Sequence, residues 1–90
     1  MNFEWDEDKR LANIARHGID FAIAVSLFDG RSLLTFPGAF RDELRYMSVG
    51  MLNGKFITAV WTQRDEAIRL ISVRASRHGE KRDYHAHHSG

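Results

Sequence analysis

The apolar residues of the first thirty positions follow the three-and-four spacing of two short helices. A glycine that can end a helix, Gly18, follows the first stripe, and the pair Asp29-Gly30 follows the second. Each stripe is preceded by an aspartate that can cap the first turn, Asp6 or Asp20. The stripes are Leu11, Ile14 and Ala15, and then Phe21, Ala24, Val25 and Phe28. The pattern predicts two N-terminal helices joined by a short turn.

After residue 30 the pattern changes to strands separated by turns. Asn53-Gly54 is typical of a two-residue hairpin, and QRDE is expected to supply a second turn. Pro37 is expected to close the first of these strands, so that GAFRDE forms a loop. A last helix is predicted from Ser76, as its N-cap, to about His88. The predicted strands are FEW near the N-terminus and then RSLLTF, LRYMSVGML, KFITAVWT and AIRLISVR.

Together these elements predict an α+β fold. Two N-terminal helices and one C-terminal helix are expected around a mainly antiparallel sheet of four to five strands. Residues 1–90 are expected to form one domain, because a chain of 90 residues is too short to divide its core in two.

The turn at Asn53-Gly54 fixes the pairing of the strands on either side of it. Leu52 should pair with Lys55, and Tyr46 with Trp61. One face of this hairpin is expected to be the core face, with Met47, Val49, Met51, Phe56 and Val60. The opposite face is expected to be shallower, with Tyr46, Ser48, Gly50, Ala59 and Trp61.

Basic residues of the strands are expected at two ends of the sheet. If QRDE is a four-residue loop, Lys55 falls opposite Arg74 at one end, beside the start of the last helix. Arg45 and Arg64 then mark the other end, beside the loop that holds Arg41. Arginine suits a phosphate site, because its planar guanidinium donates two parallel hydrogen bonds and keeps its charge.

Charge and composition narrow the function classes. The net charge is +1, with an acidic first third and a weakly basic remainder, which is too little for a protein that mainly coats nucleic acid. The absence of cysteine excludes disulfides and cysteine-based metal or redox chemistry. There is no signal-peptide pattern and no apolar stretch of roughly 18 residues, so a cytoplasmic protein without membrane contact is expected.

Three segments, in order along the chain, resemble a known family. They are WDEDKRLANIARHGIDF, then DELRYMSVG, and then TQRDEAIRLISVRA followed by Glu80 and Tyr84. Over nearly the whole chain they resemble BrnT, a family of small toxins from type II toxin–antitoxin pairs.

The resemblance implies a RelE-like ribonuclease fold and an endoribonuclease that inhibits translation. It also implies that a ribbon-helix-helix antitoxin of the BrnA type holds the toxin inactive, in a complex of two toxins and two antitoxins. RNA would be the substrate, and operator DNA would be contacted only through the antitoxin. No cofactor is expected, because RNA can be cut without a metal when its own 2′-hydroxyl attacks the adjacent phosphate.

This reaction requires cations around the scissile phosphate and groups that transfer protons. The candidates for holding the phosphate are Arg74 with Arg45, Arg64 or Lys55. The candidates for proton transfer are His78, Glu43, Tyr46 and Tyr84. Further RNA contacts are expected from Arg41, Tyr46, Arg77, Lys81, Arg82 and Tyr84. No metal ligand is expected, and DNA should not be cut because it lacks the 2′-hydroxyl.

These features also have structural explanations. Arg74 could simply pair with Glu80 in the last helix, and Tyr46 could pack against Trp61 rather than stack on a base. The histidines after residue 84 are expected in a disordered tail rather than a metal site. Two other functions therefore remain open: a catalytically silent partner of a DNA-binding antitoxin, and an unrelated α+β interaction domain.

Overall fold

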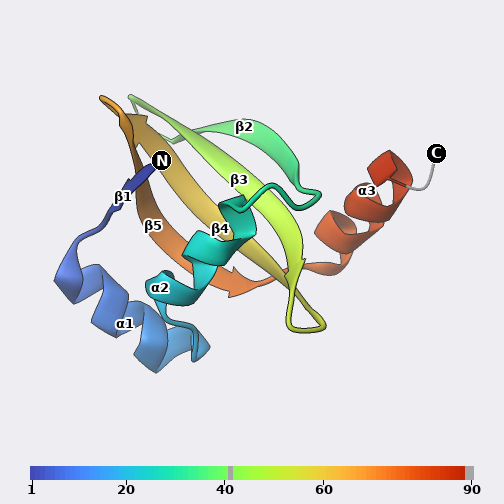
Figure 1. Cartoon of the computed structure of the whole chain (residues 1–90), viewed down its shortest axis with the longest axis horizontal. Helices are drawn as coiled ribbons and strands as arrows, with labels where there is room; N and C mark the ends of the chain where they lie inside the picture. Colours follow the sequence, from blue (N-terminus) through green and yellow to red (C-terminus); the bar gives the residue numbers. More distant parts are fainter. Residues whose placement is uncertain (41, 89–90) are drawn as a thin grey trace.

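The computed structural model describes residues 1–40 and 42–88, and it confirms the α+β fold (Figure 1). In these residues five strands form one sheet in the order β1-β5-β4-β3-β2. The strands are β1 (Asn2–Glu4), β2 (Leu34–Phe40), β3 (Glu43–Leu52), β4 (Lys55–Arg64) and β5 (Ala67–Ala75). The helices are α1 (Glu7–His17), α2 (Phe21–Ala24), the 3-10 helix η1 (Val25–Phe28) and α3 (His78–His88). Only β1 runs parallel to its neighbour, β5.

The predicted starts of both N-terminal helices and the predicted end of α1 are confirmed. The second helix is α-helical only to Ala24 and continues as the 3-10 helix η1 to Phe28. The Asp6 carboxylate accepts hydrogen bonds from the first turn of α1, and Asp20 accepts one from the Ala22 N–H at 3.0 Å. Gly18 ends α1 with a φ of 70°, a left-handed conformation that glycine adopts without strain. Its N–H donates to the Ile14 carbonyl at 2.8 Å.

The expectation that Pro37 ends its strand is wrong. Strand β2 runs through Pro37 to Phe40, and β3 begins at Glu43, so most of the predicted GAFRDE loop is strand. An edge strand tolerates proline, because only one of its sides must donate to the ladder, and β2 is an edge of this sheet. The prediction for Arg41 lies outside the described residues.

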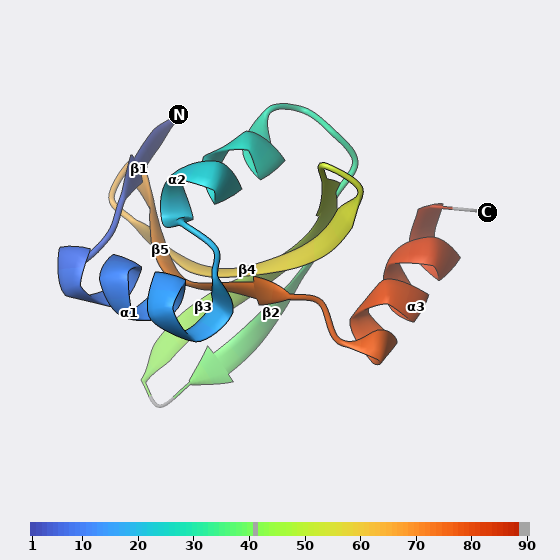
Figure 2. The ribbon, with the colours of Figure 1, turned by 90° about the horizontal axis from the view of Figure 1, so that it is seen from below.

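The hairpin register is confirmed, but the expected core face is the wrong one. Leu52 pairs with Lys55 and Tyr46 with Trp61. The helices nevertheless cover the face that was expected to be shallow (Figure 2). The buried core is formed by Phe21, Ala24, Leu27, Leu52, Ile57, Ala59, Ile68, Leu70 and Val73.

Small residues explain this choice of face. A β-carbon on Gly50 would lie 2.5 Å from Leu33 Cδ2 and 3.2 Å from Leu27 Cδ2. Ser48 and Ala59, on the same face, are fully buried. The small side chains of the sheet therefore make room for the large side chains of the helices, and they mark the face that is covered.

The turn between β4 and β5 is shorter than expected. Arg64 pairs with Ala67, which leaves two residues in the turn rather than four. A register shift beside Val60 and Trp61 adds one residue to β5. Arg74 therefore pairs with Thr58, and the expectation that it lies opposite Lys55 is wrong.

The last helix begins one residue later than expected, with Arg77 rather than Ser76 in the cap position. The Ser76 hydroxyl does not cap α3, because it is hydrogen-bonded to the buried Thr58 hydroxyl at 2.8 Å. Instead the Glu80 carboxylate accepts the Arg77 N–H at 2.7 Å, as a glutamate in the third position of a helix often does. The predicted disordered tail is also wrong as far as residue 88, because α3 includes His85–His88.

Within the described residues, no single helix is long and apolar enough to cross a membrane. Helix α1 and Phe21–Phe28 together have the length and composition of a membrane span, but the two segments are bent by 92° relative to each other.

Candidate functional site

Four arginines from three adjacent strands lie on the sheet face that α1 and α2 leave uncovered. Their strand neighbours on the opposite face, such as Trp61, Leu70 and Val73, contact the core. Side chains alternate along a strand, and the register shift in β5 brings residues 69 and 74 to the same face. The four arginines are Arg45, Arg64, Arg69 and Arg74.

A polar cleft opens at one end of this face, where β3 and β4 separate. Their backbone pairing stops at Tyr46 and Trp61, and beyond this point the Thr62 hydroxyl donates to the Leu44 carbonyl at 2.9 Å. The cleft has a volume of about 490 Å³. We call it the β3–β4 cleft; its lining residues are Asp42, Glu43, Leu44, Tyr46, Thr62, Gln63, Arg64 and Arg69.

The cations of the β3–β4 cleft differ in their partners. Arg64 forms no hydrogen bond or ion pair with any residue of the described ranges 1–40 and 42–88. Arg69 forms one contact with the Glu4 carboxylate, at 3.1 Å. Arg45, beside the cleft, donates its Nε–H to the Glu43 carboxylate at 2.9 Å. The cleft thus holds a cation that forms no ion pair with the described residues, together with a carboxylate whose orientation is fixed by Arg45.

An aromatic pair lies beside the cleft. The rings of Tyr46 and Trp61 stack with centroids 4.7 Å apart. The Trp61 indole N–H donates to the Ser48 hydroxyl at 2.9 Å, which fixes the indole ring. The structural explanation for Tyr46 is therefore confirmed, and Tyr46 is also one of the residues that line the cleft.

At the other end of the same face, Arg74 is bound by Glu80. The guanidinium donates two parallel hydrogen bonds to the carboxylate, each 2.8 Å long, and the two side chains are only 14% and 12% exposed. Glu80 also accepts from the Thr58 hydroxyl at 3.0 Å. The Arg74 hydrogen bonds lower the pKa of Glu80 to about 2, and Glu80 raises the pKa of Arg74. The expected pairing of Arg74 with Glu80 is confirmed.

The predicted site residues therefore fall into separate groups. Glu43, Tyr46 and Arg64 line the cleft, with Arg45 beside it. Arg74 lies six residues away along the sheet, since its partner Thr58 precedes Arg64 by six, which is about 20 Å. The residues of the α3 end are Arg77, His78, Lys81, Arg82 and Tyr84.

Two further predicted residues stand apart from the cleft. Lys55 lies on the helix-covered side and borders a shallow depression between the hairpin and the α1–α2 connection. Tyr84 packs edge-on against Phe56, with ring centroids 5.2 Å apart, and helps to seat α3. Neither side chain lines the cleft.

Sequence reasoning missed Arg69. In a regular strand, residues 69 and 74 point to opposite faces, so Arg69 was assigned no role. The register shift beside Val60 and Trp61 reverses that relation, and a bulge of this kind has no reliable sequence signature. Within the described ranges no group of three His, Asp or Glu residues is placed to hold a metal ion.

A cleft lined by arginines on a small α+β sheet suits a ligand that carries phosphodiesters. A family model described as the ribonuclease toxin BrnT of type II toxin–antitoxin systems matches residues 5–80. The chain belongs to this BrnT family. Membership makes it a toxin of the ribonuclease class with a cognate antitoxin as its partner. Among curated proteins, no significant match is found. The RelE-like character of the fold stays a prediction.

Proposed function

We propose that this toxin cuts RNA endonucleolytically in the β3–β4 cleft, without a metal ion. The observation that carries this proposal is Arg64, a cation that lines the cleft and has no partner among the described residues. An arginine without an ion-pair partner gains nothing for stability, but it favours an anionic ligand. Arg74, by contrast, already donates two hydrogen bonds to Glu80.

The reaction proceeds by attack of the substrate's own 2′-hydroxyl on the adjacent phosphorus. The bond from the 2′-oxygen to phosphorus forms and the bond to the 5′-oxygen breaks, which leaves a 2′,3′-cyclic phosphate and a 5′-hydroxyl. Arg64 and Arg69 donate to the non-bridging oxygens, where negative charge accumulates in the transition state. Cations fixed in advance by strands β4 and β5 need no rearrangement at that moment.

Glu43 and Tyr46 transfer the protons. The Glu43 carboxylate accepts the proton of the attacking 2′-hydroxyl, and Arg45 acts as a positioning residue through its hydrogen bond of 2.9 Å. The Tyr46 hydroxyl donates a proton to the departing 5′-oxygen. Stacking on Trp61 fixes the phenol ring, and Tyr46 is among the residues that line the cleft.

The biological setting follows from the family. The cognate antitoxin is proposed to be a ribbon-helix-helix protein of the BrnA type, in a complex of two toxins and two antitoxins that contacts operator DNA through the antitoxin. Released toxin would cut RNA and thereby inhibit translation. Support comes from the match to a type II ribonuclease toxin over residues 5–80.

The chemistry is tested with a short RNA cut by antitoxin-free protein in EDTA. We expect products with a 2′,3′-cyclic phosphate, and we expect cleavage to stop when a single 2′-deoxynucleotide replaces the residue that attacks. The matched DNA strand is the control and should stay intact. Cleavage at the 2′-deoxy position, or a requirement for a divalent cation, would contradict the mechanism. No cleavage of any RNA by the wild type would favour the silent antitoxin partner.

The proposed base is tested by Glu43→Gln, which keeps the size and removes the proton acceptor. We expect kcat/KM to fall by about 10²–10⁴-fold, the usual contribution of general acid–base catalysis. Asp83→Asn is the control, because Asp83 is an exposed carboxylate of α3 outside the cleft. Equal activity of Glu43→Gln and wild type would remove Glu43 from the mechanism.

A further inference from the structure

A second depression lies between α1 and β5, next to the arginine face. It has a volume of about 270 Å³. We call it the α1–β5 groove; its lining residues are Lys9, Ala12, Asn13, Arg16, His17, Ile71 and Ser72.

The fold creates this groove because β1 is too short to cover β5. Strand β1 pairs only with Ala67–Arg69, so the second half of β5 has no neighbouring strand on that side. Helix α1 takes this place, and the Asn13 amide pairs with the Val73 backbone at 2.8 and 3.1 Å. A helix cannot approach a strand edge as closely as a second strand does, so a groove remains beside Asn13.

The register shift of β5 connects the groove with the β3–β4 cleft. Ser72 pairs with Val60 and Arg69 with Thr62, which places both side chains on the uncovered face. Arg69 lines the cleft and Ser72 lines the groove. Three residues of strand separate them, which is about 10 Å. An extended polyanion that lies in the cleft therefore reaches the groove by following β5.

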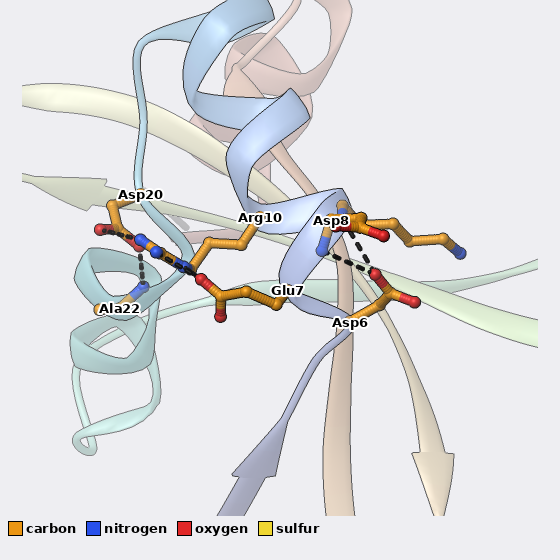
Figure 3. A network of polar contacts seen from close by, with 7 residues as sticks. Asp6, Glu7, Asp8, Arg10, Asp20 and Ala22 are labelled. Carbon is orange, nitrogen blue, oxygen red and sulfur yellow. Dashed lines mark hydrogen bonds and ion pairs between the residues drawn. The ribbon is translucent and has the colours of Figure 1, made fainter.

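The groove holds cations that the protein does not neutralise. Lys9, Arg16 and His17 have no side-chain hydrogen bond or ion pair with any residue in the described part of the chain. The Glu7 carboxylate of the first turn of α1 pairs with Arg10 instead, and Arg10 also contacts Asp20 at 2.9 Å (Figure 3).

Helix geometry brings these cations to one side of α1. Lys9 precedes Asn13 by four residues and Arg16 follows it by three, so both lie on the helix face that Asn13 turns toward β5. Lys9 and Arg16 thus line the groove on the α1 side, and Ser72 lines it on the β5 side. Its one large apolar lining residue is Ile71.

We propose that the α1–β5 groove is a second subsite for the RNA backbone, which binds a phosphate next to the scissile one. This inference rests on the proposed function and extends it to the length of RNA that the toxin holds. Free cations with a hydroxyl match phosphate oxygens, whereas the centre of a protein interface is usually built from aromatic anchors, which the groove lacks.

The test compares Lys9→Gln and Arg16→Gln with wild type in RNA binding, using 2′-O-methyl RNA that cannot be cut. A dinucleotide and an oligonucleotide of about ten nucleotides are titrated at several salt concentrations. Arg31→Gln is the matched control, because it removes the same charge outside both the groove and the cleft. Each groove variant should bind the longer RNA about fivefold more weakly at 0.1 M salt. Its log–log salt slope should fall by about 0.7, the value for one lost phosphate contact to a single strand.

For the dinucleotide, the groove variants and the wild type should have equal affinity, because its one internucleotide phosphate lies in the cleft. Unchanged affinity and salt slope of the groove variants for the longer RNA would overturn the inference and leave the proposed function standing. Loss of antitoxin binding with unchanged RNA binding would overturn it too and would assign the groove to the antitoxin. If the wild type binds neither RNA, the proposed function fails as well.

Discussion

At the scale of single residues, Asn13 shows how one amide substitutes for a strand. Its Nδ2 donates to the Val73 carbonyl at 2.8 Å, and its Oδ1 accepts the Val73 N–H at 3.1 Å. A backbone neighbour in a sheet offers the same donor and acceptor. Nδ2 also donates to the Ile19 carbonyl at 2.9 Å, so one side chain joins α1, its exit turn and β5.

We therefore predict that Asn13→Ala strongly destabilises the protein. The change leaves the Val73 N–H and carbonyl buried without partners, at a cost of about 2–4 kcal/mol in the free energy of unfolding. For a domain of this size that lowers Tm by roughly 10 °C or more. Thermal and denaturant unfolding measure both values. Asn2→Ala, an exposed asparagine of β1, is the control and should change stability by less than about 0.5 kcal/mol.

Residue-scale sequence signals were reliable where they act locally. Asp6, Asp20 and Gly18 occupy the cap positions that the sequence predicted, because a cap depends only on the next few residues. The structural role of Asn13 was not predicted, since its partner Val73 is sixty positions away. Long-range partners of a buried amide cannot be inferred from local pattern.

At the scale of elements, α3 is held to the sheet by few contacts. None of its residues is buried. Its first turn is fixed by Glu80, which joins Arg74, Thr58 and the Arg77 N–H, and its later turns by aromatic contacts to Phe56. Glu80 is therefore the residue on which the docking of α3 depends most.

We predict that Glu80→Gln destabilises the protein by about 1–3 kcal/mol at neutral pH, because it removes a charged hydrogen-bond partner from Arg74. The pKa of Glu80 falls from 4.5 to about 2 in the folded protein. Its contribution is therefore fully present above about pH 4.5 and is lost as the pH falls toward 2. Denaturant unfolding of both proteins at pH 7 and at pH 2.5 measures the difference.

The stability gap between wild type and Glu80→Gln should narrow across this acid range. A gap of equal size at both pH values would contradict the assigned role of the ion pair. Asp83→Asn provides the comparison, because the exposed pair of Asp83 with Arg82, 3.6 Å apart, should contribute less than about 1 kcal/mol.

Element-scale prediction succeeded for pairing and failed for the covered face. Asn53-Gly54 gave the β3–β4 register, because a two-residue turn leaves no freedom in the pairing. The more apolar face was expected to be the core. The buried positions Ser48, Gly50 and Ala59 show the opposite, since small residues mark where Phe21 and Leu27 approach the sheet. A pattern of hydrophobicity alone does not show this match between small side chains of the sheet and large side chains of the helices.

At the scale of the whole molecule, the two faces of the sheet have different tasks. Helix α2 and the 3-10 helix η1 bury one face and supply Phe21, Ala24 and Leu27 to the core (Figure 2). Four arginines, Arg45, Arg64, Arg69 and Arg74, lie on the other face. Helix α3 covers only the end near Phe56. The opposite end keeps its cleft open, with Arg64 unpaired among the described residues and Glu43 close to it.

Many residues of the candidate site could be predicted from the sequence, but the sequence did not show which of them lie close together. The cleft residues Glu43, Tyr46 and Arg64 were predicted from the sequence, but they were placed in one site with Arg74. Arg74 pairs with Thr58, about 20 Å from Arg64 along the sheet. The length of the β4–β5 turn and the bulge of β5 decide which arginines meet. Neither feature has a strong signature in a single sequence.

The location of the site is the central claim, and one comparison tests it most directly. RNA cleavage is measured in EDTA for wild type, Arg64→Ala and Arg74→Ala, with Arg31→Ala as a control for charge and with unfolding curves for all four. We predict that Arg64→Ala lowers kcat/KM by about 10²–10³-fold and changes stability by less than about 0.5 kcal/mol. Arg74→Ala should mainly lose stability, because it leaves Glu80 without its partner. Full activity of Arg64→Ala, together with loss of cleavage by a folded Arg74→Ala, would contradict this account and move the site to the α3 end.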